Sequence, residues 1–266
     1  MKVDHFHHQG ETLIADAIFK EMGGKGFNQA IAAARMGAGV SFLAAAGGDI
    51  TGEQCGGILR ENNVKARLAI KEGKSSAFAY ILTDCSGENQ VTVYQSAELC
   101  ENDVLQFEEE IAGSDVLLIQ HEVPECVNRV AVGIANKYRV KVILNPAPPR
   151  AVDDFLAESV FMITPNRHEA SAIECTRFAN YIVTLGSEGC CVNGNTRIPP
   201  LRVQPVNTTG AGDVFNGVLA VCIAEGMALE EAARYAVTAS GISVSKKNVV
   251  GSIPYRNEIE RRLRNG

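Results

Sequence analysis

The sequence predicts an α/β fold in which helices cover both faces of a central, mainly parallel sheet. Short apolar runs alternate with helical patterns along most of the 266 residues, and this alternation is typical of a three-layer α/β/α sandwich. Several runs are almost continuously apolar, as in strands buried on both faces of a parallel sheet. Because neither a repeat nor a low-complexity stretch interrupts the pattern, we expect one domain over residues 1–266.

The expected elements follow one another along the chain. Apolar runs that end in polar or turn residues predict the strands Val40–Ala45, Val116–Gln120, Lys141–Asn145, Phe161–Thr164 and Tyr181–Leu185. Helical periodicity predicts the helices Phe27–Met36, Gly52–Glu61, Pro124–Tyr138, Asp213–Ala224 and Leu229–Ser245.

Three further β-like segments lie outside this alternation. They span residues 12–19, 77–83 and 90–95, and no helical pattern separates the last two. The residues from Asp84 to Asn89 between them are suited to a hairpin loop. We therefore expect a small separate sheet that covers one edge of the main domain as a lid.

Composition excludes several classes of partner. The formal net charge is −6 and the basic residues are dispersed, which argues against a nucleic-acid or anionic-membrane surface. No apolar run approaches the roughly 20 residues that span a bilayer, and the N-terminus lacks the apolar core of a signal peptide. The eight cysteines form no C-x-x-C pair, so we interpret them as small buried thiols in a reducing cytoplasm. His5, His7 and His8 could bind a metal adventitiously, but a solvated terminus is the simpler interpretation.

The strongest chemical signal is the segment from Asn207 to Gly217, which leads directly into an apolar helix. Gly210, Ala211 and Gly212 allow a tight turn with several N–H groups directed at one place, and the helix N-terminus adds partial positive charge. Asp213 at the rim of this anion hole suits a base that takes a proton from an attacking hydroxyl. The alternative is a helix N-cap.

A second glycine-rich turn, from Gly23 to Gln29, also opens a helix. Its glycines permit close approach to a polyol, and Asn28 offers a donor and an acceptor for vicinal hydroxyls. The spacing of a Walker loop is absent. Alone, this turn would be weak evidence.

Together, the two segments resemble the paired signatures of the ribokinase-like (PfkB-type) carbohydrate kinases. Gly-Gly-Lys-Gly-x-Asn-Gln stands near the start, and Asn-Thr-Thr-Gly-Ala-Gly-Asp-x-Phe-x-Gly stands near the end. Landmarks at residues 144–148, 164–169 and 184–189 follow in the family's order, so the resemblance covers essentially the whole chain. It implies a ribokinase-like sandwich with a β-sheet lid.

The resemblance also implies roles for individual residues. Asp213 would be the catalytic base, with Gly210, Ala211 and Gly212 as its anion hole. The residues facing the sugar would be Gly24, Lys25, Gly26, Asn28 and Glu122. Asn166 and Glu169 would help to place Mg²⁺ and the phosphates. The ATP site would be lined by Thr184, Gly186, Ser187 and Gly189. A monovalent cation would lie near Asn207, Thr209, Ser243, Lys246, Asn248 and Ser252.

The implied activity is transfer of the ATP γ-phosphate to a primary hydroxyl of a small sugar, and the residues of the motifs favour ribose as that sugar. A nucleoside or another sugar remains an alternative acceptor, and a non-catalytic sugar or nucleotide sensor is an alternative from another class. Lids of this family pack against each other, so we expect a homodimer with Ile14, Phe78 and Tyr80 among its contacts. No nucleic acid or membrane partner is expected.

Three departures from the family pattern lead to further expectations. The family's first strand is missing upstream of Gly10, and only residues 171–180 precede the strand that begins at Tyr181. Either the chain is shortened or residues are omitted, and we favour omission because loss of a core strand would expose a sheet edge. Asn207 stands where most ribokinases have Asp, and a neutral amide should weaken the binding of K⁺.

Overall fold

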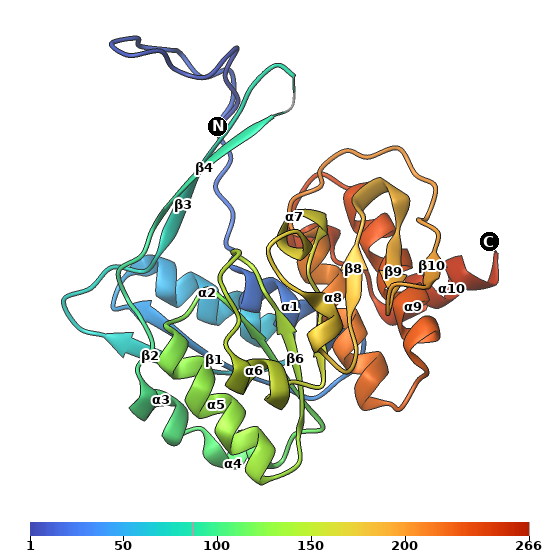
Figure 1. The fold of residues 1–266 in the computed structure, drawn as a ribbon. Coiled ribbons are helices and arrows are strands. Elements are labelled where there is room, and N and C mark those ends of the chain that lie inside the picture. Colours follow the sequence, from blue (N-terminus) through green and yellow to red (C-terminus); the bar gives the residue numbers. More distant parts are fainter. Residues whose placement is uncertain (87, 266) are drawn as a thin grey trace.

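The computed structural model describes residues 1–86 and 88–265 and consists of an α/β body with a projecting β-arm (Figure 1). In the body, β1 (Val40–Gly47) and β2 (Val64–Lys71) pair in parallel, with Val40 opposite Val64. A second parallel group has the order β5-β6-β7. Its strands are β5 (Val116–Gln120), β6 (Lys141–Asn145) and β7 (Met162–Ile163). The predicted parallel strands are confirmed, apart from shifts of one or two residues at their ends.

Helices cover both faces of these strands, as predicted. Along β6, Ile143 packs into one apolar core with α1 (Lys25–Arg35) and α8 (Ala211–Ala224), whereas Val142 and Leu144 pack into the other with the helices between residues 101 and 159. This alternation follows from the two-residue period of a strand. The helices are α1 (Lys25–Arg35), α2 (Ile50–Glu61), α3 (Glu101–Leu105), α4 (Glu108–Ala112), α5 (Glu125–Lys137), α6 (Asp154–Ser159), α7 (Arg167–Ala170), α8 (Ala211–Ala224), α9 (Leu229–Val244) and α10 (Arg256–Arg264).

The C-terminal half adds an antiparallel group to the parallel strands. It consists of β8 (Ile182–Thr184), β9 (Cys190–Val192) and β10 (Thr196–Ile198), in the order β10-β9-β8. Parallel bridges from Ile163 to Tyr181 and from Asn166 to Thr184 place β8 beside β7. The connection from β7 to β8 contains α7 and, within residues 171–180, a single 3₁₀ turn, η1 (Cys175–Arg177).

Close packing of α1 against α8 brings the two glycine-rich turns together. A Cβ atom at Gly217 would lie 2.7 Å from the Ala32 Cβ and would also collide with the Gln29 carbonyl. Glycine is therefore required at this crossing, because any side chain would separate the helices. Since both helices begin at the same end of the contact, residues from sequence positions near 25 and 213 become neighbours.

The arm is a hairpin of β3 (Phe78–Thr83) and β4 (Asn89–Tyr94), in which Phe78 lies opposite Tyr94. The two predicted strands of this hairpin are confirmed, and Gly87 of the predicted loop lies outside the described residues. The prediction of a strand over Thr12–Phe19 is wrong, because its pairing is limited to one bridge between Ala17 and Lys2. Instead, residues 1–3 run along β3, with the Val3 N–H donating to the Thr83 carbonyl.

Two observations concern membranes and thiols. Among residues 1–86 and 88–265, none of the helices combines the length and apolarity needed to cross a bilayer. All eight cysteines are free. The expectation of buried thiols holds for Cys190 and Cys222 but is wrong for Cys85, Cys100 and Cys126, which are exposed. These three lie in the lid loop, at the start of α3 and in the first turn of α5.

Candidate active site

Asp213 lies in the first turn of α8 and is only 8% exposed. Its two carboxylate oxygens accept hydrogen bonds from side-chain amides of α1: Asn28 Nδ2 donates to Oδ2 at 2.9 Å, and Gln29 Nε2 donates to Oδ1 at 3.3 Å. These two donors come from the glycine-rich turn at the other end of the sequence. The geometry thus joins the two predicted motifs at one carboxylate.

The environment of Asp213 makes its carboxylate more basic than usual. Burial is the largest cause and raises the pKa of Asp213 to about 6, although the Asn28 and Gln29 hydrogen bonds and the charge of Lys25 act in the opposite direction. Desolvation disfavours the charged form of a carboxyl group, whereas donors to the carboxylate favour it. A carboxylate with a pKa near working pH is well suited to accept a proton.

A chain of polar side chains that the sequence analysis did not identify supports Asp213 through Gln29; Gln29 and Asn145 are buried and Gln120 is half-buried. Gln29 Nε2 also donates to Asn145 Oδ1 at 3.1 Å, and Gln120 Nε2 donates to Gln29 Oε1 at 2.6 Å. Gln120 and Asn145 are the last residues of β5 and β6, so they meet at the carboxyl edge of the sheet, where ligands bind in open α/β folds. In the sequence, the one feature that could have identified Gln120 and Asn145 was the position of each as a polar residue at the end of an apolar strand.

The glycine turn before α1 has the tight geometry that its sequence predicted. Gly24 has a φ of 116°, a backbone angle that residues other than glycine rarely adopt. The Lys25 N–H donates to Glu122 Oε2 at 2.8 Å. A Cβ at Gly26 would lie 3.1 Å from both Phe42 and Gln120. The predicted sugar-facing residues of this turn therefore lie beside Glu122.

Two buried polar atoms near this turn have no hydrogen-bond partner among the described residues. One is Asn28 Oδ1, on the same amide that donates to Asp213. The other is His121 Nε2, whose ring partner Nδ1 lies 3.3 Å from the Pro148 carbonyl oxygen. Burial lowers the pKa of His121 to about 4, so this ring is neutral at pH 7. Unsatisfied buried polar atoms are costly and are expected to meet a ligand or water.

The start of α8 has the form predicted for an anion hole. Gly210 is left-handed, with a φ of 78°, and a Cβ there would lie 2.9 Å from Val249 Cγ1. The first N–H groups of a helix lack intrahelical partners. The Ala211 N–H donates to the Thr208 carbonyl at 3.2 Å, so Gly212 and Asp213 are left as the better candidates for anion contacts.

Asn166 and Glu169 form a capping box at α7. Asn166 Oδ1 accepts from the Glu169 N–H at 2.8 Å, while the two Glu169 carboxylate oxygens accept from the Asn166 N–H and Nδ2, each at 2.8 Å. Burial raises the pKa of Glu169, and the charge of Lys25 lowers it. Because Lys25 also acts on Asp213, its ammonium group lies within electrostatic range of both carboxyl groups.

The predicted nucleotide loop lies next to Asn166. The Thr184 N–H donates to the Pro165 carbonyl at 2.9 Å, and η2 (Gly186–Glu188) follows as a single 3₁₀ turn. Gly186 and Gly189 both have positive φ angles. At Gly189 a Cβ would collide with the Ile198 carbonyl, which explains why glycine stands there. Ser187 is exposed on this turn.

The residues expected around a monovalent cation gather where residues 207–209 meet the end of α9. The Asn207 side chain is engaged at both ends: Oδ1 accepts from the Thr209 N–H at 3.0 Å, and Nδ2 donates to the Lys247 carbonyl at 2.7 Å. Lys246 Nζ pairs with Glu258 at 3.2 Å, away from this group.

The hydroxyl groups of the two predicted serines are also engaged. Ser243 Oγ donates to the Ser240 carbonyl at 2.8 Å, and Ser252 Oγ donates to the Val249 carbonyl at 2.7 Å. Asn248 lies on the same turn, with its Cβ 3.3 Å from the position that a Cβ on Gly251 would take. The Asn207, Ser243 and Ser252 side chains already bond to backbone groups, so backbone carbonyls that remain unpaired are the better candidates for cation ligands.

Comparison with known proteins agrees with this geometry. Residues 1–256 match the pfkB family of carbohydrate kinases. A ribokinase from Haemophilus influenzae is 35% identical over 97% of this chain and 92% of its own length, and one from Bacillus subtilis is 34% identical over 96% and 92%. A crystal structure of ribokinase from Thermotoga maritima matches with a TM-score of 0.88 at 30% identity, covering 99% of this chain and 95% of that one.

Proposed function

The chain belongs to the pfkB family of carbohydrate kinases, and from this premise we propose that it transfers the γ-phosphate of ATP to the primary hydroxyl of ribose. Ribose is supported by the ribokinases that are 34–35% identical over more than nine-tenths of their length. The observation that carries the proposal is the buried Asp213 carboxylate, held between two α1 amides at the start of α8. Neither a helix cap nor a simple binding site requires that arrangement.

Asp213 accepts the proton of the attacking hydroxyl. The hydroxyl oxygen forms the new bond to the γ-phosphorus, the bond from this phosphorus to the bridging oxygen of ADP breaks, and the proton passes to a carboxylate oxygen of Asp213. Asn28 and Gln29 fix the carboxylate in place, so little reorganisation is needed at the moment of transfer. The N–H groups at the start of α8 stabilise the charge on the transferring group.

The sugar binds against the glycine turn before α1. Gly24, Lys25 and Gly26 allow its hydroxyl groups to approach the backbone, and the Glu122 carboxylate, which already accepts from the Lys25 N–H, offers a second oxygen. Asn28 Oδ1, which is buried without a partner among the described residues, accepts from a substrate hydroxyl. A sugar at this place has its reacting oxygen next to Asp213.

ATP lies across the Thr184–Gly189 turn, with its phosphates toward α8. The residues at α7 fit Mg²⁺, because carboxylate and amide oxygens are its preferred protein ligands, and the Glu169 carboxylate retains free lone pairs beside Asn166. Bound Mg²⁺ neutralises charge on the phosphates. Lys25 supplies a second positive charge, near both Asp213 and Glu169.

Potassium binds weakly or is dispensable. The Asn207 amide donates to the Lys247 carbonyl, and an ionised Asp could not make this bond. The bond connects the 207–209 segment to the chain that follows α9, which a cation would otherwise bridge. Asn207→Asp removes the donor and adds a charge, so the variant should gain activation by K⁺ relative to the wild-type chain. Equal K⁺ dependence of both proteins would overturn this account of Asn207.

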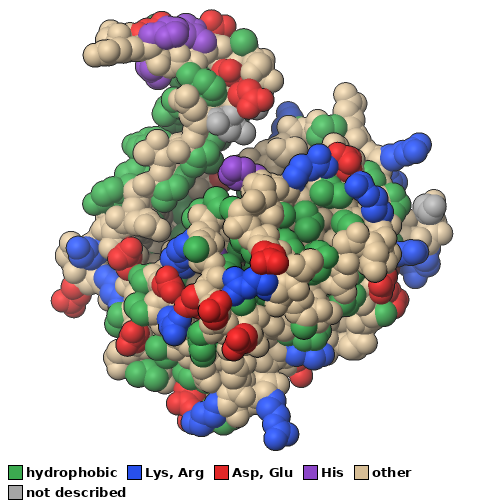
Figure 2. Space-filling model, viewed as in Figure 1, with side chains coloured by type: hydrophobic (Ala, Val, Ile, Leu, Met, Phe, Trp, Pro, Cys, Tyr) green, Lys and Arg blue, Asp and Glu red, His purple; other side chains and the backbone are tan. Residues whose placement is uncertain are grey.

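The arm supports a homodimer through the lid. Hydrophobic side chains run along it (Figure 2), and Ile14, Phe78 and Tyr80 are 92%, 46% and 58% exposed. Exposed apolar surface of this extent marks an interaction site. Sedimentation should show a dimer at micromolar concentration for the wild-type chain and a monomer for Phe78→Glu. A wild-type monomer would defeat the proposal.

One assay tests the function directly. ADP release is measured with a panel of ribose, fructose, glucose and adenosine, each at saturating ATP and Mg²⁺. We expect ribose to have the highest kcat/KM. Phosphorylation of another acceptor would correct the substrate, whereas no ADP release with any acceptor would leave a non-catalytic binding protein.

The free thiols on the surface are consistent with a reducing compartment, and we propose the cytoplasm.

A further inference from the structure

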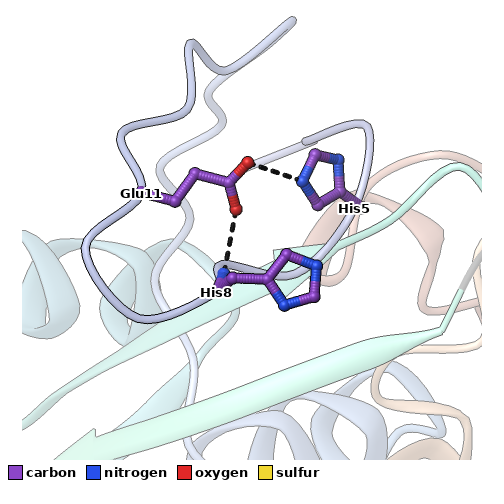
Figure 3. Close-up of side chains that lie close together, drawn as sticks. All are labelled: His5, His8 and Glu11. Atoms are coloured by element: carbon purple, nitrogen blue, oxygen red, sulfur yellow. Dashed lines mark hydrogen bonds and ion pairs between the residues drawn. The ribbon is translucent and has the colours of Figure 1, made fainter.

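A cluster of metal-ligating side chains lies at the outer end of the arm, in a loop outside the residues assigned above to catalysis and ligand binding. It consists of His5, His8 and Glu11 (Figure 3). Figure 1 shows this N-terminal loop beyond the end of the β3–β4 hairpin, far from α8. In Figure 2, histidine side chains gather at the same tip. Whatever this cluster binds is therefore separate from the sugar and the nucleotide.

The donor atoms are already close to the spacing of a coordination shell. One donor from each side chain can be chosen so that all three lie within 4.8 Å of one another. His5 Nε2 is 2.9 Å from Glu11 Oε1. Zinc–nitrogen and zinc–oxygen bonds of about 2.0–2.2 Å place tetrahedral ligands roughly 3.3 Å apart. Rotation of the side chains would direct the three donors at one ion.

The loop holds these side chains in place through its own backbone. The His8 N–H donates to Glu11 Oε2 at 2.9 Å, and the Glu11 N–H donates to the His8 carbonyl at 3.1 Å, so these two residues close a turn. The Cys85 N–H donates to the Asp4 carbonyl at 3.2 Å, which fastens the loop to the hairpin. His5 and Glu11 are only partly exposed, at 42% and 29% of their side-chain surface.

A second carboxylate selects the nitrogen of His5 that would bind the ion. Asp4 Oδ2 lies 3.2 Å from His5 Nδ1, on the opposite side of the ring from Glu11. In metal sites, a ligating histidine usually donates its other N–H to a carboxylate, which fixes the tautomer and increases the basicity of the ligand. The Asp4–His5 pair has this arrangement, with Nε2 left to face Glu11.

We propose that His5, His8 and Glu11 bind one divalent transition-metal ion at the tip of the arm, with Asp4 orienting His5. Two imidazoles and one carboxylate suit Zn²⁺, and three protein ligands leave one position for water or another donor. His7 is outside the cluster and exposed. The ion would tie the two ends of the 5–11 loop together.

Metal titration of the metal-free chain tests the proposal, with Co²⁺ as a spectroscopic probe for Zn²⁺. We expect one equivalent to bind. His8→Ala and Glu11→Gln should each weaken binding by at least about tenfold, and Asp4→Asn by about tenfold, the usual effect of removing an orienting partner. His7→Ala is the matched control and should remain within about twofold of wild type. Thermal unfolding curves establish that each variant is folded.

The exposed cysteines are the competing ligands, and the Co²⁺ spectrum identifies them. Thiolate ligands give an intense near-ultraviolet charge-transfer band, which a nitrogen–oxygen site lacks. Absence of binding, a thiolate band at the first equivalent, or equal affinity in His8→Ala and wild type would each overturn the proposal.

Limited proteolysis gives a second measure that does not depend on affinity. Chymotrypsin cleaves after Phe6, which lies between two of the ligands. Zn²⁺ should slow cleavage at this bond in the wild-type chain and in His7→Ala, but not in Glu11→Gln. Equal protection by Zn²⁺ in all three proteins would contradict a site at the tip. Neither test measures kinase activity, so failure here is distinguishable from failure of the proposed function.

Discussion

Asp213 and Asp49 both lie at the start of a helix after a glycine-containing segment, yet the two carboxylates have opposite environments. Asp49 is the N-cap of α2, and its oxygens accept from the Gly52 N–H at 2.9 Å and the Ser76 N–H at 2.7 Å. These donors lower the pKa of Asp49 to about 2. Asp213 lies inside α8, is held by side-chain amides, and has its pKa raised to about 6 by burial.

The comparison distinguishes a structural carboxylate from a chemical one. A capping carboxylate satisfies N–H groups that would otherwise lack partners, and its ionisation stabilises the folded state. A carboxylate that is buried without a direct ion pair destabilises the folded state when it ionises, which proteins tolerate where the basicity is used. The sequence alone allowed Asp213 to be a cap. In the structure the N-cap of α8 is Gly210, and Asp213 accepts from side-chain amides instead of from the first N–H groups of the helix.

The largest expected effect is on turnover. Asp213→Asn keeps the size of the side chain but cannot accept the proton, so kcat should fall by a factor on the order of 100 to 10,000, the usual contribution of a positioned base. ATP affinity should change little, because the Thr184–Gly189 turn is untouched. Steady-state kinetics and nucleotide titration measure both quantities. Asp49→Asn is the control and should keep a near-normal kcat. If the kcat of Asp213→Asn is within a few-fold of the wild-type value, the assignment of Asp213 as the catalytic base is wrong.

The same substitution should stabilise the fold at neutral pH. Because the folded-state pKa of Asp213 is above its unfolded value, its contribution to stability is fully present below about pH 3.8 and is lost as pH rises to about 6. Asp213→Asn avoids that loss, a gain on the order of 2–3 kcal/mol at pH 7, at about 1.4 kcal/mol per pKa unit. Ligand-free thermal unfolding at pH 4 and pH 7 should show the gain over wild type growing with pH. A gain that is absent at pH 7 would mean that Asp213 is not strained by burial.

Removal of the Asn28 amide should have an intermediate effect. Asn28→Ala deletes the 2.9 Å bond to Asp213 Oδ2, and hydrogen bonds to charged groups contribute about 1.5–3 kcal/mol. We expect kcat/KM for the sugar to fall roughly 10- to 100-fold. The pKa of Asp213 should rise further, since this bond lowers it. If kcat/KM per folded molecule stays within threefold of wild type, the amide neither positions Asp213 nor contacts the sugar.

Substitution of Asp49 should have the smallest effect. Its effect on stability should depend on pH in the opposite direction from that of Asp213→Asn. Asp49→Ala removes the cap of α2, so its Tm at pH 7 should be lower than that of the wild-type chain. The contribution of Asp49 is present above about pH 3.8 and is lost as pH falls through about 2. The difference in Tm should therefore shrink toward acid. A deficit that is unchanged at pH 2 would contradict the role of ionised Asp49.

The sequence predicted the elements that carry the site better than the elements at its periphery. α8 is an almost continuous apolar run and α9 has apolar residues at helical spacing, so both helices were recognisable. The turns at Gly24 and Gly210 were recognisable because they need backbone angles that favour glycine. β2 was missed because Lys65 and Arg67 alternate with small apolar residues on a partly exposed strand. α10 was missed because Ile259 is its one fully buried side chain among the described residues.

The partners of Asp213 show which contacts of the site could not be predicted from the sequence. Asn28 and Asp213 were predicted because each lies in a motif with a recognisable turn. Gln120 and Asn145 were not assigned roles, because each is a single polar residue at the end of an apolar strand, and their contact with Gln29 depends on strand order. The false lid strand at residues 12–19 has the same origin: its β-like composition does not specify a pairing partner.

The pH dependence of kcat/KM for the sugar tests the central claim most directly, namely that Asp213 is the base. With the nucleotide present throughout as its Mg²⁺ complex, the profile of the wild-type chain should have an acidic limb with an apparent pKa near 6. That limb should be absent from the residual activity of Asp213→Asn and unchanged in Asp49→Asn. An acidic limb that persists in Asp213→Asn would contradict the assignment and transfer the role of base to another group.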